Sequence, residues 1–285
     1  MSTVSVSRKG TSGRSLWSRV QPAVVVLLTA FLLGLPLWMM VVTAGKSQAE
    51  ALSPSLSLPS DWQLWQNVTE IFSRGNITAG FFGSLLVMVP SVLIVLVLGS
   101  MAAWVLARRS SKAMAVAYGA AISGVVLPPA VVTIVLLLRQ IGLSGSVIGM
   151  ICVYAGIYMS TVIFFVTGFV RTIPVELEEA ARVDGAGPVK IFARIILPLL
   201  VPVLSTATIL ICLYVWNDVF YAFFVLSGSL DTLPLNLYSV ASAGLYLNNW
   251  HLIFAYIILM SLPLLLVFMF AQRKIISGVT SGAVK

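Results

Sequence analysis

Charged side chains are scarce in this sequence. Lys, Arg, Asp and Glu together make up 9% of its 285 residues, whereas a soluble globular domain carries about 25%. Hydrophobic residues make up 59%, and the mean hydropathy is +1.04. So few polar residues cannot cover the surface of a water-soluble protein of 30.6 kDa. The composition therefore excludes a soluble fold and predicts a chain that lies mostly in lipid.

Residues that commonly carry chemistry are also few. The chain has one histidine, His251, and two cysteines, Cys152 and Cys212, which lie in apolar runs and are predicted to be small core residues. No set of His and Cys has the spacing of metal ligands, and no Ser or Cys has a credible histidine partner for nucleophilic catalysis. A Gly-x-x-x-x-Gly-Lys-Ser/Thr loop for ATP is missing too. We expect a chain that is not an enzyme and binds no cofactor itself.

Six long apolar segments make up most of the chain. Lipid offers no hydrogen bonds to the backbone, so each segment is predicted to be a transmembrane helix of an all-α integral membrane protein. The six segments lie at 23–43, 81–107, 113–138, 146–168, 199–226 and 252–270. They divide the chain into an N-terminal segment (1–22), a six-helix transmembrane domain (23–272) and a C-terminal tail (273–285).

The distribution of Lys and Arg predicts the orientation of the spans. If the six spans alternate in direction, 14 of the 17 basic residues lie on one side, and only Lys46, Arg74 and Arg139 lie on the other. Basic residues favour the cytoplasmic side, so both termini are predicted to be cytoplasmic. The net charge of +8 then reflects membrane topology and not nucleic-acid binding. A cleaved signal peptide is the alternative for the first span, but a signal h-region has only about 7 to 15 residues.

Two outer connectors have distinctive compositions. Residues 46–78 contain Pro, Ser and Trp, and we predict an ordered excursion at the outer interface. The connector 229–250 has no Lys or Arg and is apolar and aromatic for a loop. We expect it to re-enter the bilayer or to be covered by another protein.

Charge is concentrated in the large cytoplasmic connector, 170–198. Seven of the 26 charged residues fall between Glu176 and Arg194. Three glutamates come first, where they suit the positive end of a helix, and Gly185 is a candidate left-handed cap. Pro188 can begin a second short helix. The pattern predicts a short helix, a glycine turn and a second short helix.

Two interpretations of this element are open. An amphipathic helix can lie on the membrane surface, but such helices are usually basic, whereas this one is acidic. The small residues Ala180 and Ala181 at its centre would allow another protein surface to approach closely, as in helix-in-groove recognition. Docking to a partner protein is the favoured interpretation.

The spacing within 179–198 is Glu-Ala-Ala, three residues, Gly, nine residues, Ile, one residue, Leu-Pro. This pattern resembles the "EAA" loop of permease subunits of binding-protein-dependent ABC importers, and every position of it is met. The carbohydrate branch is the most similar, through Trp216-Asn217-Asp218, Trp250, Pro263 and the tail 278–285. One departure is Gly83-Ser84, where such permeases often carry Asn-Ser.

The resemblance implies a type I ABC importer permease fold in the cell (inner) membrane, with a cytoplasmic coupling helix. In this family the EAA helix sits in a cleft of an ATPase subunit, which binds ATP and Mg. A bulky residue at Gly185, as in Gly185→Asp, should then spare membrane insertion and uncouple transport. The residues implied to couple to the ATPase are Glu178, Glu179, Ala180, Ala181, Asp184, Gly185, Ile195, Leu197 and Pro198.

A pathway for a substrate is predicted around Asp218, because ionisable groups inside lipid usually face a cavity or a partner. Aromatic faces beside a carboxylate and an amide suit sugar hydroxyls. A hydrogen bond between helices is the equal alternative for Asp218, and core packing is the alternative for the tyrosines of the fourth span. The pathway candidates are Tyr158, Tyr214, Trp216, Asn217, Asp218 and Tyr221, with Tyr154 as a further one.

The resemblance also implies the partners. They are a second, non-identical permease, an ATPase dimer, an extracytoplasmic substrate-binding protein, membrane lipid and a sugar substrate, with no nucleic acid. A permease for glycerol phosphate, a polyamine or a phosphonate is the alternative within the class. A self-sufficient secondary transporter is the alternative outside it, and would need an ion-coupling site and usually an internal repeat.

Overall fold

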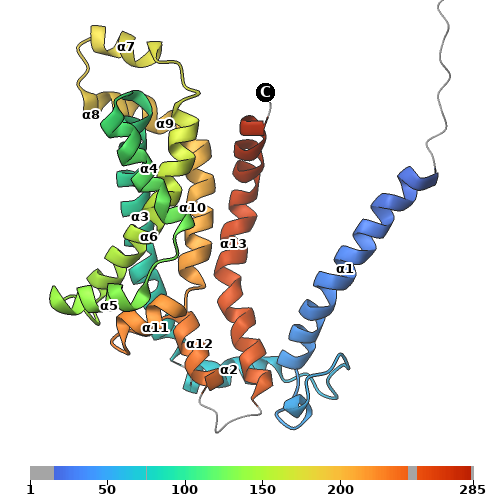
Figure 1. The fold of residues 1–285 in the computed structure, drawn as a ribbon. Coiled ribbons are helices and arrows are strands. Elements are labelled where there is room, and N and C mark those ends of the chain that lie inside the picture. The colour runs from blue at the N-terminus through green and yellow to red at the C-terminus, as the bar shows by residue number, and fades with distance from the viewer. Residues whose placement is uncertain (1–15, 75, 243–248, 284–285) are drawn as a thin grey trace, which may run out of the picture. The chain divides into compact units, whose positions relative to one another are not determined.

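The computed structural model describes residues 16–74, 76–242 and 249–283, and the chain divides into two compact units. Unit 1 comprises residues 1–67 and 248–255, and unit 2 comprises residues 68–247 and 256–285. Every regular element in the described ranges is a helix, which confirms the all-α prediction (Figure 1). Most of the predicted N-terminal segment and the last two residues of the predicted tail lie outside the described residues.

The predicted spans correspond to long helices or to bent pairs of helices. Within the described residues, four helices are long and apolar enough to cross a membrane, and six spans result if each of two bent pairs counts as one. The long helices are α1 (Leu16–Ala44), α3 (Ile77–Arg108), α6 (Val147–Val170) and α13 (Trp250–Ala283). The bent pairs are α4 (Lys112–Val126) with α5 (Val131–Gln140), at 115°, and Pro188–Leu199 with α10 (Val201–Trp216), at 76°.

The prediction of one continuous helix over 113–138 is wrong. The helix stops at Val126 and resumes at Val131 after a break that contains Pro128 and Pro129. Each proline lacks a backbone N–H, and a proline also disfavours helical geometry in the residue before it. Two successive prolines therefore end α4 and allow the sharp bend into α5.

The prediction of one continuous helix over 199–226 is also wrong. α10 ends at Trp216, and α11 (Phe220–Leu226) begins after a break of three residues. The Asp218 side chain accepts hydrogen bonds from the N–H groups of Tyr221 at 3.3 Å and Ala222 at 3.0 Å. A short acidic side chain that bonds the backbone locally competes with helix continuation. Asp218 thus ends one helix and begins the next.

Residues 46–67, the part of the predicted connector 46–78 that belongs to unit 1, form a structured segment, as predicted. The Lys46 ammonium is buried and donates to the Ser55 carbonyl at 3.1 Å and to the Ser55 and Ser57 hydroxyls at 2.8 and 3.2 Å. The Asn67 amide, at the start of α2 (Leu64–Arg74), donates to the carbonyls of Ala44 and Lys46. Hydrogen bonds from Ser60 hold the pKa of Glu50 below its usual range. Polar side chains therefore hold this segment in place.

Unit 2 is built around α3 and α6, which pack along each other. Gly99 on α3 faces Val162 and Met159 of α6, and a Cβ at Gly99 would come within 2.8 Å of the Val162 side chain. Small residues allow such close approach of helices in lipid. The apolar core formed by α3, α6 and α10 includes Val95, Ala103, Met150, Val162, Val166, Ala207 and Ile211, all fully buried.

The connector 229–250 forms α12 (Leu233–Ser242), which packs against α3, while residues 243–248 lie outside the described residues. The Leu233 N–H donates to the buried Ser84 hydroxyl at 2.9 Å, and its carbonyl accepts from the Tyr256 hydroxyl at 3.3 Å. Gly83 leaves no room for a side chain, because a Cβ there would collide with the Asp231 carbonyl oxygen. The close approach of the Asp231 backbone therefore requires a glycine at position 83.

We expect Gly83→Ala to destabilise the protein by about 1 to 3 kcal/mol, because the Asp231 backbone must move to admit the methyl group. The control is Gly80→Ala on the same helix, where the nearest atoms lie at an ordinary 3.4 Å. Thermal unfolding in mild detergent measures both variants. Equal stability of the two would contradict the close approach at Gly83.

Candidate functional site

The connector between α6 and α10 forms a helix, a glycine turn and a second helix, as predicted. α7 (Glu176–Val183) has three glutamates in its first turn, where the helix dipole favours them. Gly185 has φ +75°, and the N–H groups of Gly185 and Ala186 donate to the carbonyls of Arg182 and Ala181. These bonds end α7 in a Schellman motif, which needs a residue with positive φ. The turn therefore sets the angle at which α7 meets the second helix.

The second helix runs from Pro188 to Leu199. It consists of α8 (Pro188–Ile191), a π-helical stretch (Phe192–Ile196) and α9 (Leu197–Leu199). Proline at its first position lacks an N–H that would have no partner there. Its buried side chains are Ile191, Phe192 and Ile196, so apolar packing anchors it to unit 2.

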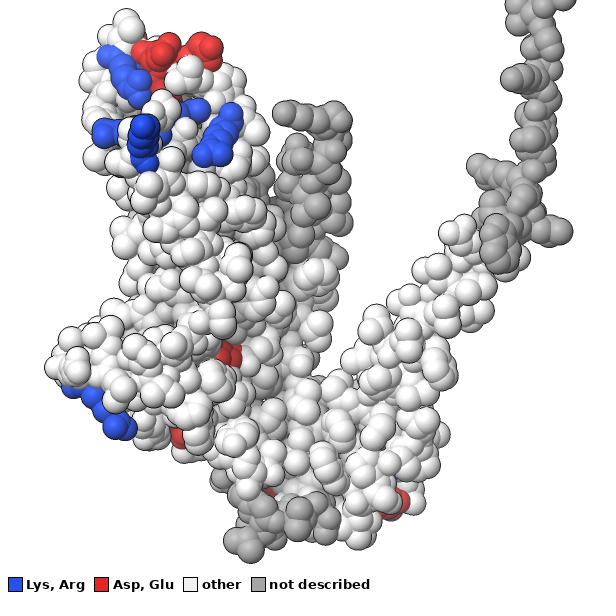
Figure 2. All heavy atoms as spheres, in the orientation of Figure 1, with Lys and Arg blue, Asp and Glu red and all other residues white. Residues whose placement is uncertain are grey.

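Most of the predicted coupling residues lie at the surface of this element. Figure 2 shows Lys and Arg side chains together with Asp and Glu side chains over α7 and α8, at one end of unit 2. Exposed side chains can contact a second protein without rearrangement. Glu179, Ala180, Asp184, Gly185 and Pro198 are exposed, whereas Ala181, Ile195 and Leu197 are half-buried.

Two valines beside the glycine turn extend this surface, and the sequence analysis missed them. Val183 is 88% exposed at the end of α7, and Val189 is 75% exposed at the start of the second helix. The sequence could have predicted these exposed valines, because they flank a glycine turn in the most charged stretch of the chain. The turn therefore presents an apolar tip flanked by carboxylates.

Glu178 differs from the other predicted coupling residues because its side chain is completely buried. One carboxylate oxygen, Oε1, accepts from Arg108 Nε at 2.7 Å and from Trp104 Nε1 at 3.1 Å. The other oxygen, Oε2, lies 3.3 Å from the Arg182 guanidinium. Glu178 therefore bonds to α3 of its own chain and is not displayed to a partner.

Four of the predicted pathway residues lie in one connected cluster within unit 2. The rings of Tyr158 and Tyr214 are stacked, with centroids 5.8 Å apart and planes 7° apart. Tyr154 lies beside Tyr158, at 6.0 Å between centroids, and its hydroxyl donates to Asp218 Oδ2 at 2.8 Å. The hydrogen bond between helices, which was the alternative for Asp218, is thus present.

The other predicted pathway residues have local roles. Trp216 is 2% exposed, and its indole N–H donates to the Met260 carbonyl at 3.0 Å, so it packs inside the helix bundle. The Asn217 amide donates to the Leu213 carbonyl one turn earlier in α10. Tyr221 packs edge-to-face against Phe220. The contacts of Trp216 and Asn217 are thus separate from the stacked tyrosines, whereas Tyr221 adjoins their cluster, because its N–H donates to Asp218 Oδ1 at 3.3 Å.

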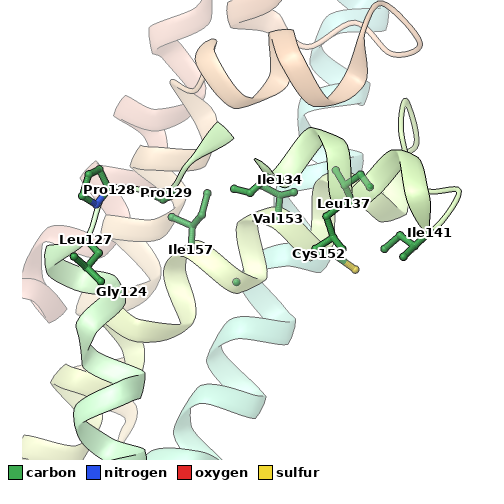
Figure 3. Close-up of a pocket in the computed structure, with 12 residues that line it drawn as sticks. Gly124, Leu127, Pro128, Pro129, Ile134, Leu137, Ile141, Cys152, Val153 and Ile157 are labelled. Carbon is green, nitrogen blue, oxygen red and sulfur yellow. The ribbon is translucent and has the colours of Figure 1, made fainter. Parts of the chain in front are cut away.

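The bend between α4 and α5 leaves two adjoining cavities beside α6. The first, of about 440 Å³, has an apolar lining that includes Pro128, Pro129 and Cys152 (Figure 3). The second, of about 560 Å³, shares the two prolines and is also lined by Tyr158 and Tyr214. Interrupted apolar helices often border transport sites, so the Pro-Pro pair in the sequence could have predicted a cavity here.

Among the described residues, no three His, Cys, Asp or Glu side chains are grouped to hold a metal.

Sequence comparison gives matches over most of the chain. Residues 95–281 match the family described as binding-protein-dependent transport system inner membrane component. The chain is 34% identical over 259 residues to the melibiose/raffinose/stachyose import permease protein MelC of Bacillus subtilis (strain 168), covering 88% of this chain and 91% of that protein. It is 29% identical over 285 residues to the diacetylchitobiose uptake system permease protein NgcG of Streptomyces coelicolor, covering 97% and 92%.

Structural comparison gives a match of similar extent. The fold is similar to a chain in the crystal structure of a bacterial ABC transporter involved in the import of the acidic polysaccharide alginate, with a TM-score of 0.76. The two chains are 21% identical, and the match covers 92% of this chain and 99% of that chain.

Proposed function

The chain belongs to the binding-protein-dependent transport system inner membrane component family, and we propose that it is the permease subunit of an importer for a sugar or oligosaccharide. The structural likeness confirms the predicted type I ABC importer permease fold. The chain is accordingly a multi-pass inner-membrane transport subunit and not an enzyme.

The exposed surface of α7 is the observation that supports coupling to an ATPase. Glu179, Ala180 and Asp184 are exposed beside the Gly185 turn, and they would enter a cleft of a cytoplasmic ATPase subunit. ATP and Mg would bind to that subunit and not to this chain. This end of unit 2 and both termini would face the cytoplasm, since 14 of the 17 basic residues belong to the segments predicted on that side.

The cavity beside the stacked tyrosines supports a sugar as the transported solute. Tyr158 and Tyr214 offer flat aromatic faces at a hollow of about 560 Å³, and apolar walls with a few polar groups are typical of small-molecule sites. The relatives named above are permeases for oligosaccharides. We propose that a second, non-identical permease completes the pathway, and that a substrate-binding protein delivers the sugar from outside.

Co-purification in mild detergent tests this function. We expect a second permease and an ATPase to co-purify with the tagged chain. Glu179→Lys should lower the recovery of the ATPase tenfold or more, because the new ammonium group would lie against a basic group of the ATPase or leave it without its partner. Asp61→Lys makes the same charge change in the outer segment and should leave recovery unchanged. A chain that is purified alone and transports without ATP would contradict the proposal.

A further inference from the structure

Glu178 is the only buried side chain of α7, and it is charged. The helix is joined to α6 at one end and to the Gly185 turn at the other, and Figure 1 shows it lying across the end of unit 2 beside α8. An ordinary surface helix is held by an apolar stripe. α7 instead reaches the interior through a carboxylate that is 0% exposed.

Apart from Arg182 on α7 itself, the partners of Glu178 lie on one face of the last turn of α3. Trp104 and Arg108 are four residues apart, and neighbours at this spacing lie on one face of a helix. Both donate to Glu178 Oε1, at 3.1 and 2.7 Å. Arg108 also donates from Nη2 to the Ile173 carbonyl at 2.9 Å, just before α7. The end of α3 therefore holds both α7 and the residues just before it by hydrogen bonds.

The ring of Trp104 extends the same contact to the second helix. It lies 5.7 Å from the ring of Phe192, which is buried in the π-helical stretch. A buried carboxylate is tolerated only when its partners compensate the lost hydration, and removal of one partner is costly. The group formed by Trp104, Arg108 and Glu178 is thus a stiff joint between the surface element and α3.

α3 connects the group formed by Trp104, Arg108 and Glu178 to the opposite end of unit 2. Ser84 and Gly83, which contact Leu233 and Asp231, lie about 20 residues before Trp104, or roughly 30 Å along the helix axis. Contacts at both ends of one continuous helix allow a displacement at one end to be felt at the other.

We propose that Glu178 and Arg108 are positioning residues that transmit movement of α7 to α3, and that Glu178 makes no contact with the ATPase. The inference rests on the proposed function, because it presupposes that α7 docks on an ATPase subunit. In this assignment the exposed Glu179 contacts the ATPase subunit, whereas the buried Glu178 transmits the movement of α7 to α3.

The complete importer in proteoliposomes tests this assignment, with radiolabelled raffinose as the transport probe and Glu176→Gln as a control that removes an exposed charge from the same turn. We expect Glu178→Gln to retain the ATPase subunit at the wild-type ratio. Raffinose uptake should fall tenfold or more, and the binding protein should no longer raise the rate of ATP hydrolysis. Glu176→Gln should match the wild type in all three measurements.

A second set of variants covers the case in which Glu178→Gln does not fold. Trp104→Phe removes only the indole N–H and should lower uptake about threefold with the ATPase retained. Arg108→Gln combined with Glu178→Gln should harm uptake no more than either change alone, since both break one joint. Loss of the ATPase subunit from Glu178→Gln, or wild-type uptake by Trp104→Phe, would overturn the assignment.

Failure of the proposed function would look different. If the wild-type assembly retains no ATPase, the chain is not an importer subunit. If it retains the ATPase but takes up no raffinose, the choice of sugar is wrong. The response of ATP hydrolysis to the binding protein then still decides the role of Glu178.

Discussion

Replacing Gly185 with valine should leave the chain in the membrane and reduce ATP-driven uptake tenfold or more. The φ of +75° at this position is costly for a residue with a Cβ, by about 1 to 2 kcal/mol, and β-branched residues suit it least. No atom lies within 4 Å of a Cβ placed at Gly185, so the cost comes from the backbone and not from a collision. Because 1.4 kcal/mol is about a tenfold change in population, few molecules would present α7 at the docking angle.

Gly187→Ala is the matched control for this experiment. Gly187 lies two residues away in the same turn, also in open space, but has an ordinary φ of −72°. Asparagine and aspartate tolerate a left-handed conformation better than valine, so Gly185→Asn and Gly185→Asp should give smaller losses. Uptake is measured at matched levels of membrane-inserted protein. Normal uptake by Gly185→Val would show that the angle of the turn does not matter for coupling.

Replacing Asp218 with alanine should destabilise the fold by about 2 to 3 kcal/mol. The change removes the acceptor that begins α11 and leaves the hydroxyl of Tyr154, which is 2% exposed, without its bond. Thermal unfolding in detergent measures the loss. Uptake should fall with the amount of folded protein, while the concentration of sugar that gives half-maximal uptake should stay unchanged.

Two further variants separate a structural role of Asp218 from contact with sugar. Tyr154→Phe should cost about 1 kcal/mol, because it removes one of the three bonds that Asp218 accepts. Tyr214→Ala opens the half-exposed stacked pair at the cavity and should raise the half-maximal sugar concentration with little loss of stability. A stable Asp218→Ala protein with weakened sugar affinity would place Asp218 in the pathway instead.

The connector 170–198 shows how much of a structure local sequence patterns can predict. Its acidic first turn, the left-handed Gly185 and the proline that begins the second helix were all predicted correctly, because each depends on a few neighbouring residues. The same pattern placed Glu178 with Glu179 as a docking residue. Only the fold shows that one of these adjacent carboxylates is buried against Arg108 and the other is exposed.

The sequence by itself determined that the chain is an all-helical membrane protein, where its apolar segments lie, and to which family it belongs. Hydropathy and capping act over a few residues, so these conclusions needed no knowledge of distant contacts. The tertiary structure decided which tyrosines stack. It also decided that the carboxylate of Glu178 is paired with a guanidinium 70 residues away. A buried charge is stable only beside its partner, and packing of α7 against the end of α3 brings the two together.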